Sequence, residues 1–270
     1  MRCKYLDHQI NVRTDGQYRL CCMSLEPEND YNIKTHTPQE WHDSEFHKKT
    51  REQMERNEWP DACTRCEQME KQGLTSQRLK LKAYGPGLSH LDLRLGNSCN
   101  LICISCWHMS SSSIAEEAIA MQKEGITPLH GILDVPNFNW SSEETFDKLL
   151  ELPIQEVYFT GGEPMMVKHL PAFLERLDPD TQIRFNTNCT IWNPKLEKLL
   201  RKFRMVIMSL SLDATDRRID YIRHGSKWKE IIEPNLHRYG SFAKVDIAPT
   251  VSILNAWFYD DIKEYADKHG

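Results

Sequence analysis

Several features of membrane, secreted or nucleic-acid-binding proteins are missing from this sequence of 270 residues. No apolar run approaches the ~20 residues that a membrane-spanning helix needs, and the segment Met1 to Asp7 lacks the apolar stretch of a signal peptide. The net charge is −5 and no dense block of lysine and arginine occurs, which argues against a nucleic-acid partner. Internal repeats and low-complexity segments are also missing. We therefore expect a cytoplasmic protein with no membrane and no nucleic-acid partner.

Cysteine is the informative residue type that is present. Apolar residues make up 40% of the chain, enough for one large domain or a large domain plus a small one. In the reducing cytosol, clustered cysteines indicate metal binding more often than disulfides. The nine cysteines form a central group, an N-terminal group and two leftovers. In that order they are Cys99, Cys103 and Cys106; Cys3, Cys21, Cys63 and Cys66; and Cys22 and Cys189.

The first part of the chain, residues 1–82, is predicted to be a small hairpin-plus-helix domain. Thr14-Asp15-Gly16 between the strand-like segments 8–13 and 17–22 is typical of a hairpin. Thr37-Pro38 provides an N-cap and an N1 proline for one helix, and a second, charged helix is expected over 43–57.

The second part, residues 83–270, alternates strands and helices after the boundary segment Tyr84-Gly85-Pro86-Gly87. Five βα units in a row predict an α/β fold with parallel strands and helices outside. Residues 128–139 are expected to be an irregular insertion. The predicted strands are 91–95, 156–160, 182–187, 205–212 and 244–253, and the predicted helices are 112–123, 141–152, 168–177, 194–203, 227–239 and 256–268.

The central cysteines have the spacing C-x3-C-x2-C directly after strand 91–95. Structural zinc normally takes four ligands, whereas a cubane iron–sulfur cluster on three cysteines keeps one iron open. A zinc site completed by His108 is the alternative. Gly161-Gly162-Glu163-Pro164 follows strand 156–160, and its glycines would let the backbone approach a ligand closely. Both motifs lie at the carboxyl ends of strands, where parallel α/β folds bind ligands.

Together these two motifs resemble the radical SAM superfamily. The resemblance implies a partial TIM-like barrel of five to six βα units. It also implies a [4Fe–4S] cluster whose open iron binds S-adenosylmethionine. Reductive cleavage would then release a 5′-deoxyadenosyl radical that abstracts hydrogen from a substrate, with electrons from a donor such as flavodoxin or ferredoxin. The cluster ligands implied are Cys99, Cys103 and Cys106, and the cofactor-binding residues implied are Gly161, Gly162, Glu163, Asn188, Ser211, Arg223 and Asn255.

Some of these polar positions have a simpler interpretation. Each one taken alone is also typical of a helix cap or a loop hydrogen bond, and Asp213 is expected to cap the turn at 213–216. The residue before the third cysteine is commonly large or aromatic in the superfamily and packs near adenine. Here it is Ser105, which cannot stack, so Trp107 is either a substitute for it or a core residue.

The N-terminal cysteines, with Gly16 between the first two, resemble the twitch (half-SPASM) module of radical SAM enzymes. That resemblance implies a second, auxiliary [4Fe–4S] cluster on Cys3, Cys21, Cys63 and Cys66, which would serve electron transfer or structure. The same ligands suit structural zinc. Cys22 is interpreted as a bystander, because adjacent side chains on a strand point to opposite faces, with a role as an alternative ligand as the other option. Cys189 is interpreted as a small core residue.

Neither the substrate nor the catalytic residues can be read from the sequence. Peptide or protein modification is preferred by analogy, and a small-molecule substrate is the other option. The alternative function is a non-catalytic zinc-binding or interaction protein that keeps the fold. Superfamily barrels usually have six βα units, so strand 244–253 is expected to be an edge that needs cover. The N-terminal domain, another chain or further sequence would provide that cover.

Overall fold

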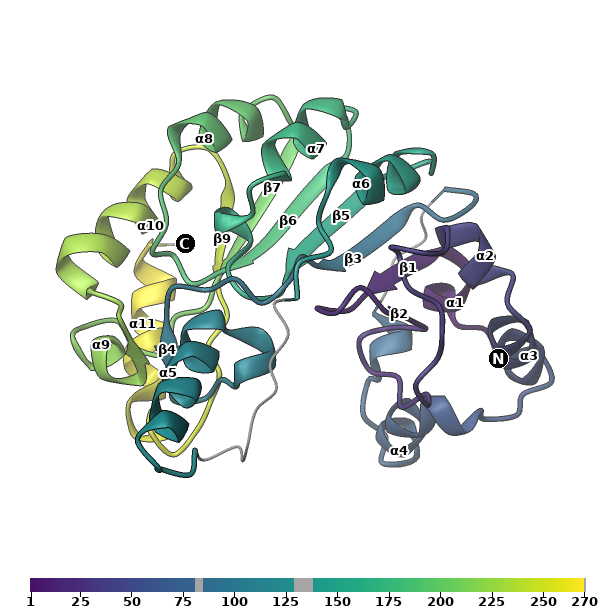
Figure 1. Ribbon diagram of the computed structural model, residues 1–270, viewed down its shortest axis with the longest axis horizontal. Helices are drawn as coiled ribbons and strands as arrows, with labels where there is room; N and C mark the ends of the chain where they lie inside the picture. Colours follow the sequence, from purple (N-terminus) through teal and green to yellow (C-terminus); the bar gives the residue numbers. More distant parts are fainter. Residues whose placement is uncertain (81–84, 129–137, 270) are drawn as a thin grey trace.

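A seven-stranded sheet organises the computed structural model, which describes residues 1–80, 85–128 and 138–269 (Figure 1). The strand order is β2-β1-β3-β5-β6-β7-β9, and every neighbouring pair is parallel except β1 with β2. The bounds are β1 Gln9–Val12, β2 Tyr18–Arg19, β3 His90–Arg94, β5 Glu156–Thr160, β6 Gln182–Thr187, β7 Met205–Leu210 and β9 Lys244–Ile247. The predicted α/β fold is confirmed.

Alternation along the strands gives the sheet one apolar and one polar face. On the apolar face, Phe159 of β5 stacks on Phe185 of β6 with 4.9 Å between ring centroids. Helices cover this face (Figure 1): Phe173 of α7 meets Phe159 edge-on at 6.1 Å and stacks on Phe146 of α6 at 4.4 Å. These side chains are buried in one continuous core. The polar face is therefore left to bind ligands.

The helices follow the predicted alternation with local differences. Their bounds are α5 Ser112–Lys123, α6 Glu143–Leu150, α7 Leu170–Arg176, α8 Pro194–Leu200, α9 Arg218–Ile222, α10 Glu233–Gly240 and α11 Tyr259–His269. The predicted helix 227–239 begins instead as a π-helical turn, Trp228–Ile232, before α10. Pro234 in the first turn of α10 has no N–H to donate, which changes the hydrogen-bond ladder there. None of the helices described is long and apolar enough to cross a membrane.

The N-terminal part contains the predicted hairpin, β1 with β2, whose turn places Gly16 at a φ of +88°. Thr37 caps α2 in a capping box with Glu40, as the sequence indicates. Of the two apolar anchors of α3, Met54 is buried whereas Phe46 is exposed. The helices of this part are α1 Lys4–His8, α2 Pro38–His42, α3 Glu45–Glu55 and α4 Thr64–Lys71.

β1 pairs in parallel with β3, so the N-terminal part extends the main sheet. The six parallel strands from β1 to β9 follow one another in chain order, and β1 supplies the sixth parallel strand. The N-terminal part lies beyond β3, at the edge opposite β9, and so does not cover the β9 edge (Figure 1). The boundary between 82 and 83 and most of the insertion 128–139 lie outside the described residues, and the division into two domains stays a prediction.

A buried histidine of α3 packs against α2. His47 is fully buried, and Arg51 Nη1 donates to its Nδ1 at 2.7 Å and to His42 Nε2 at 2.9 Å. Burial, together with the nearby charges of His42 and Arg51, lowers the pKa of His47 to about 3. The ring must therefore stay neutral in the folded protein.

We expect this histidine to make the fold sensitive to acid. Below pH 6.5 the unfolded chain protonates residue 47 whereas the folded chain does not, so stability falls as the pH falls. His47→Gln keeps an acceptor but removes the titration. Between pH 7.0 and 5.5 the variant should lose about 1 kcal/mol less unfolding free energy than the wild type, as measured by urea denaturation. The exposed His237→Gln is the control, and an equal loss in all three proteins would contradict the prediction.

Candidate active site

A pocket of about 230 Å³ lies at the carboxyl ends of the parallel strands. We call it the strand-end pocket. The predicted residues of the central site line it, with the exception of Glu163 and Asn255. The predicted residues that line it are Cys99, Cys103, Cys106, Gly161, Gly162, Asn188, Ser211 and Arg223. The fold therefore brings together residues that lie more than 100 positions apart in the chain.

Serines at the start of α5 fix the backbone of the cysteine loop. Ser112 Oγ accepts from Cys99 N at 3.1 Å, and Ser113 Oγ donates to Cys99 O at 2.7 Å. Ser111 Oγ donates to the carbonyl of Leu101, which is fully buried, at 2.7 Å. The loop is thus held in place by the protein itself. Sequence reasoning missed this role, although the run Ser110–Ser113 was a visible signal.

A short antiparallel ribbon joins the cysteine loop to a distant segment. β4, Ile102–Cys103, pairs with β8, Arg223–His224, so that Cys103 lies opposite Arg223. Ile104 N also donates to Ile222 O at 2.9 Å. Two-residue strands leave no periodic pattern, so the sequence could not indicate this pairing.

Arg223 lies between an acid and a thiol. Its Nε is 2.8 Å from Asp213 Oδ2, with both side chains buried, and its Nη1 donates to Cys103 Sγ at 3.9 Å. Asp213 Oδ1 accepts from Thr250 N at 2.7 Å, so Asp213 joins two strand-end loops instead of capping the turn at 213–216. This ion pair holds a cation beside the cysteines, where it favours thiolates and anionic ligands.

The two glycines pack the loop after β5 directly against the loop after β3. Gly162 N donates to Gly96 O at 2.9 Å, and Gly161 has a φ of +116°. A Cβ on Gly162 would lie 2.2 Å from Ser98 O, and one on Gly161 would lie 2.7 Å from Gly96 O. Side chains at these positions would therefore push the cysteine loop away.

Glu163 turns away from the strand-end pocket. Its carboxylate is buried and accepts from Asn188 N at 2.7 Å and from Thr187 Oγ1 at 2.8 Å. Burial raises the pKa of Glu163 to about 7, although these hydrogen bonds oppose the shift. Glu163 therefore fixes the end of β6, where Asn188 Nδ2 donates to Asn100 Oδ1 at 3.0 Å.

Asn255 also lies outside the pocket and is fully buried. Its Nδ2 donates to Asp213 O at 3.2 Å and to Thr250 O at 3.0 Å, and its Oδ1 accepts from Ser252 N at 2.7 Å. Its side chain therefore supports the loop after β9, and Thr250 is the residue of that loop that lines the pocket.

The structure excludes one of the two interpretations of Trp107. Ser105 lines the pocket, whereas Trp107 does not and is 47% exposed, so Trp107 is not a core residue. Its indole N–H donates to Ser110 Oγ at 3.0 Å. His108 does not line the pocket either. Cys189 is fully buried and lies at a φ of +63° in the turn after β6, which confirms its interpretation as a core residue.

The N-terminal cysteines line a second cavity, which we call the four-cysteine cavity. Cys3, Cys21, Cys63 and Cys66 all line it, whereas Cys22 does not. Its walls are otherwise mostly apolar, and burial raises the pKa of the Cys63 thiol to about 12. Across the chain as described, no three or more histidine, cysteine, aspartate or glutamate side chains are grouped to hold a single metal ion.

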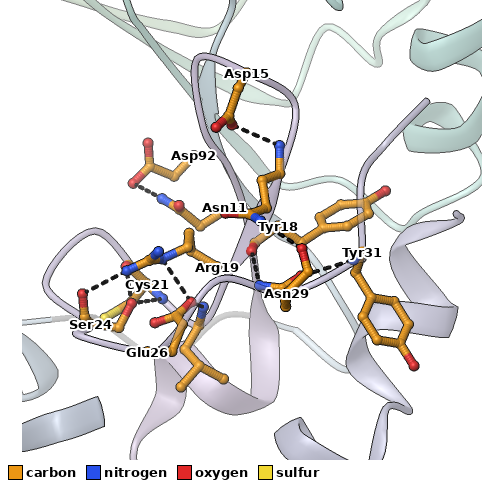
Figure 2. Close-up of polar contacts among 12 residues, drawn as sticks. Asn11, Asp15, Tyr18, Arg19, Cys21, Ser24, Glu26, Asn29, Tyr31 and Asp92 are labelled. Carbon is orange, nitrogen blue, oxygen red and sulfur yellow. Dashed lines mark hydrogen bonds and ion pairs between the residues drawn. The ribbon is translucent and has the colours of Figure 1, made fainter. Parts of the chain in front are cut away.

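The loop that carries Cys21 is held by a buried ion pair (Figure 2). Arg19 Nε is 2.9 Å from Glu26 Oε1, which also accepts from Leu20 N at 2.8 Å. Ser24 Oγ donates to Cys21 O at 2.6 Å. These contacts join the two ends of the segment 19–26 and so help to position Cys21.

Arg78 brings a positive charge to the four-cysteine cavity. It lines the cavity, pairs with Glu70 at 2.5 Å and packs over the Trp59 ring at 5.2 Å. A cation near four thiols favours their thiolate forms, which are the metal ligands.

Parallel α/β sheets bind ligands at the carboxyl ends of their strands, and three cysteines line the pocket at that edge here. The family model of the Radical SAM superfamily matches residues 93–234. The chain belongs to the Radical SAM superfamily and is therefore an enzyme of that class. Membership implies a [4Fe–4S] cluster and S-adenosylmethionine as cofactors.

Three similar proteins add detail. A probable GTP 3′,8-cyclase of Methanocella arvoryzae is 28% identical over 141 residues, which are 51% of this chain and 38% of the cyclase. A GTP 3′,8-cyclase of Peptoclostridium acidaminophilum is 21% identical over 198 residues, 71% of this chain and 55% of the cyclase. This chain thus spans 38% and 55% of their lengths. The crystal structure of Streptococcus suis SuiB bound to S-adenosylmethionine has a TM-score of 0.40 at 14% identity, covering 89% of this chain and 45% of SuiB.

We expect Gly162→Ala to disturb the site, because the new Cβ meets a backbone oxygen that cannot move without the cysteine loop. The variant should lose about 2–3 kcal/mol of unfolding free energy, measured by chemical denaturation. Gly240→Ala is the matched control. No heavy atom lies within 4 Å of its added Cβ, and alanine favours the end of α10. A loss of the same size in both variants would contradict the close-packing role of Gly162.

Proposed function

We propose that this protein reductively cleaves S-adenosylmethionine at the strand-end pocket and uses the radical to abstract hydrogen from a substrate. The observation that carries the proposal is the convergence of Cys99, Cys103 and Cys106 with Gly161 and Gly162 around one pocket. The buried ion pair of Arg223 and Asp213 supports it, because it keeps a cation beside these cysteines.

The residues present fit the implied group. Cys99, Cys103 and Cys106 would ligate a [4Fe–4S] cluster through three irons and leave one open. When bound, the cluster and S-adenosylmethionine supply a 5′-deoxyadenosyl radical, which is the reactive species. The rest of the chemistry of the site is binding and orientation.

The protein residues would orient the cofactor in distinct ways. Asp213 pairs with Nε of Arg223, which leaves the Nη atoms of Arg223 beside the pocket. A guanidinium group suits a carboxylate ligand, so Arg223 would bind the carboxylate of the cofactor. Gly161, Gly162, Asn188 and Ser211 line the pocket and would contact the cofactor directly. Glu163 and Asn255 would act as positioning residues, because each is buried behind the pocket and bonded to a loop that lines it.

A second [4Fe–4S] cluster on Cys3, Cys21, Cys63 and Cys66 is the further part of this proposal, in a twitch-like N-terminal domain of residues 1–82. Its support is the four-cysteine cavity, the fixed loop of Cys21 and the nearby Arg78. With four cysteine ligands it would serve electron transfer or structure. A cytoplasmic location and a reducing partner such as flavodoxin or ferredoxin complete the proposal.

The substrate is proposed only by class. Peptide or protein modification is our preferred class, and a small molecule is the alternative. The named activity of the two cyclases, which act on GTP, favours the small-molecule alternative, but those proteins are much longer than this chain.

The central test replaces Cys99, Cys103 and Cys106 together by alanine in anaerobically reconstituted protein. We expect iron to fall from about eight to about four atoms per chain, and 5′-deoxyadenosine formation on reduction to be lost. Iron and sulfide analysis and chromatography measure both. Continued 5′-deoxyadenosine formation would overturn the proposed function. Zinc without iron in the wild type, with no binding of S-adenosylmethionine, would favour the non-catalytic alternative.

A second test uses adjacent cysteines as a matched pair. Cys21 lines the four-cysteine cavity and Cys22 does not. Cys21→Ala should therefore lower the iron content of the N-terminal site, while Cys22→Ala should keep about eight iron atoms per chain. Metal analysis and the absorbance of the clusters provide the readout. Equal iron loss in both variants would contradict the assignment of Cys21 as a ligand. If the N-terminal site of the wild type contains zinc and no iron, the proposed second cluster is wrong and the site is a structural zinc site.

A further inference from the structure

The polar face of the sheet holds a cavity with a volume of about 790 Å³. We call it the polar cavity. Its walls come from the first half of the strands, whereas the strand-end pocket is at their carboxyl ends. Tyr5, Cys22, Gln77 and Lys80 of the N-terminal part also line it. Cys22, interpreted from the sequence as a bystander, thus faces this cavity. The volume is within the usual range for small-ligand sites.

The polar cavity adjoins the strand-end pocket along one face of the sheet. Asp92, Tyr158 and Arg184 are in register on β3, β5 and β6, and they line the polar cavity. Two residues further along the same strands, Thr160 and Asn186 point to the same face and line the strand-end pocket. One pleat repeat, about 6.6 Å, separates the two rows. A ligand in the polar cavity is therefore next to the site where the radical would form.

One side of the polar cavity is acidic and accepts hydrogen bonds. Asp92 on β3 is buried, and among the described residues its one hydrogen-bond donor is Asn11, at 2.7 Å (Figure 2). Burial raises the pKa of Asp92 to about 6, which Arg94 opposes, so the carboxylate is ionised at pH 7.5. Gln9 on β1 is 2% exposed, and its Oε1 has no hydrogen-bond partner within the described parts of the chain. A buried acceptor of this kind is costly unless a ligand donates to it.

The other side of the cavity is basic. Arg184 on β6 packs over the ring of Tyr158 at 5.2 Å, donates to Ser209 Oγ at 3.0 Å and has Asp246 at 3.7 Å. Its side chain is still 40% exposed and lines the cavity. Lys244 on β9 lies in the same row, through Ile207. Glu156 lies nearer the acidic side, with His90 at 3.7 Å, and Lys80 reaches the cavity from the N-terminal part.

We propose that the polar cavity binds a dipolar ligand, with an ammonium group at Asp92 and Gln9 and an anionic group at Arg184 and Lys244. Two strand spacings, about 9–10 Å, separate the backbones of β3 and β6. The ligand must therefore carry its two charges some distance apart, as a peptide or an ω-amino acid does. This inference rests on the proposed function, since the ligand would be the substrate of the same enzyme.

The test uses 6-aminohexanoate as the dipolar probe, with hexylamine and hexanoate as probes that each lack one charge. Affinities are measured by calorimetry on the full chain at pH 7.5. We expect 6-aminohexanoate to bind roughly tenfold more tightly than either single-charge probe. Triglycine tests the peptide source, because it has similar terminal charges. Tighter binding of triglycine supports a peptide ligand, and weaker binding supports a free small molecule of the same dipolar class.

Two variants locate the charges. Asp92→Asn should weaken the binding of 6-aminohexanoate roughly tenfold and leave the affinity for hexanoate unchanged. Arg184→Gln should also weaken the binding of 6-aminohexanoate roughly tenfold, but it should leave the affinity for hexylamine unchanged. Asp180→Asn and Arg204→Gln, exposed residues of an ion pair outside the cavity, are the matched controls. Arg184 is partly exposed, so its variant keeps the test valid if Asp92→Asn fails to fold.

Equal affinity of the three charge probes, no binding of any of them, or equal losses in the control variants would overturn the proposal. Iron content and S-adenosylmethionine binding of each variant are measured in parallel. If both are retained while the probes show no charge preference, the dipolar ligand is wrong and the proposed function stands. If S-adenosylmethionine does not bind the wild type, the proposed function itself fails, independently of the probes.

Discussion

The close contact between the loops after β3 and β5 is the constraint on which the rest of the site depends. Gly162 N bonds to Gly96 O, and the main chains approach so closely that a Cβ at Gly162 would lie 2.2 Å from Ser98 O. The cysteine loop begins directly after this contact. Its start is therefore held against the loop after β5 by backbone packing.

Buried polar groups extend this constraint around the strand ends. Glu163 joins β5 to β6, Asn188 joins β6 to the cysteine loop, and Asp213 joins Arg223 to the loop after β9. Such groups are costly to bury unless every partner is in place. They therefore favour a single arrangement of the loops, which is what a cofactor site needs for precise orientation.

The pairing of β1 with β3 joins the N-terminal part, which carries four of the cysteines, to the sheet that ends at the strand-end pocket. The N-terminal part thereby contributes a strand to the barrel and also wall residues, such as Tyr5 and Cys22, to the polar cavity. Residues of the N-terminal part line one side of that cavity. On β5 and β6 the cavity is followed by Thr160 and Asn186, which line the strand-end pocket. The cavity is composite because β1 joins the main sheet, which places residues of the N-terminal part beside the polar face of the other strands.

The sequence by itself determined the two cysteine groups and the positions of several helices and strands. Periodicity and capping residues located β5 and β6, α2 and α5, because these signals are local. The tertiary structure decided the features that depend on contacts between distant segments. These are the place of β1 in the main sheet and the pairing of β4 with β8. It also decided which side chains line a cavity, as Cys22 does, and which do not line the strand-end pocket, as with Glu163 and Asn255. A side chain's type shows what it can bind, but which partner it meets is fixed only when strands far apart in the chain become neighbours.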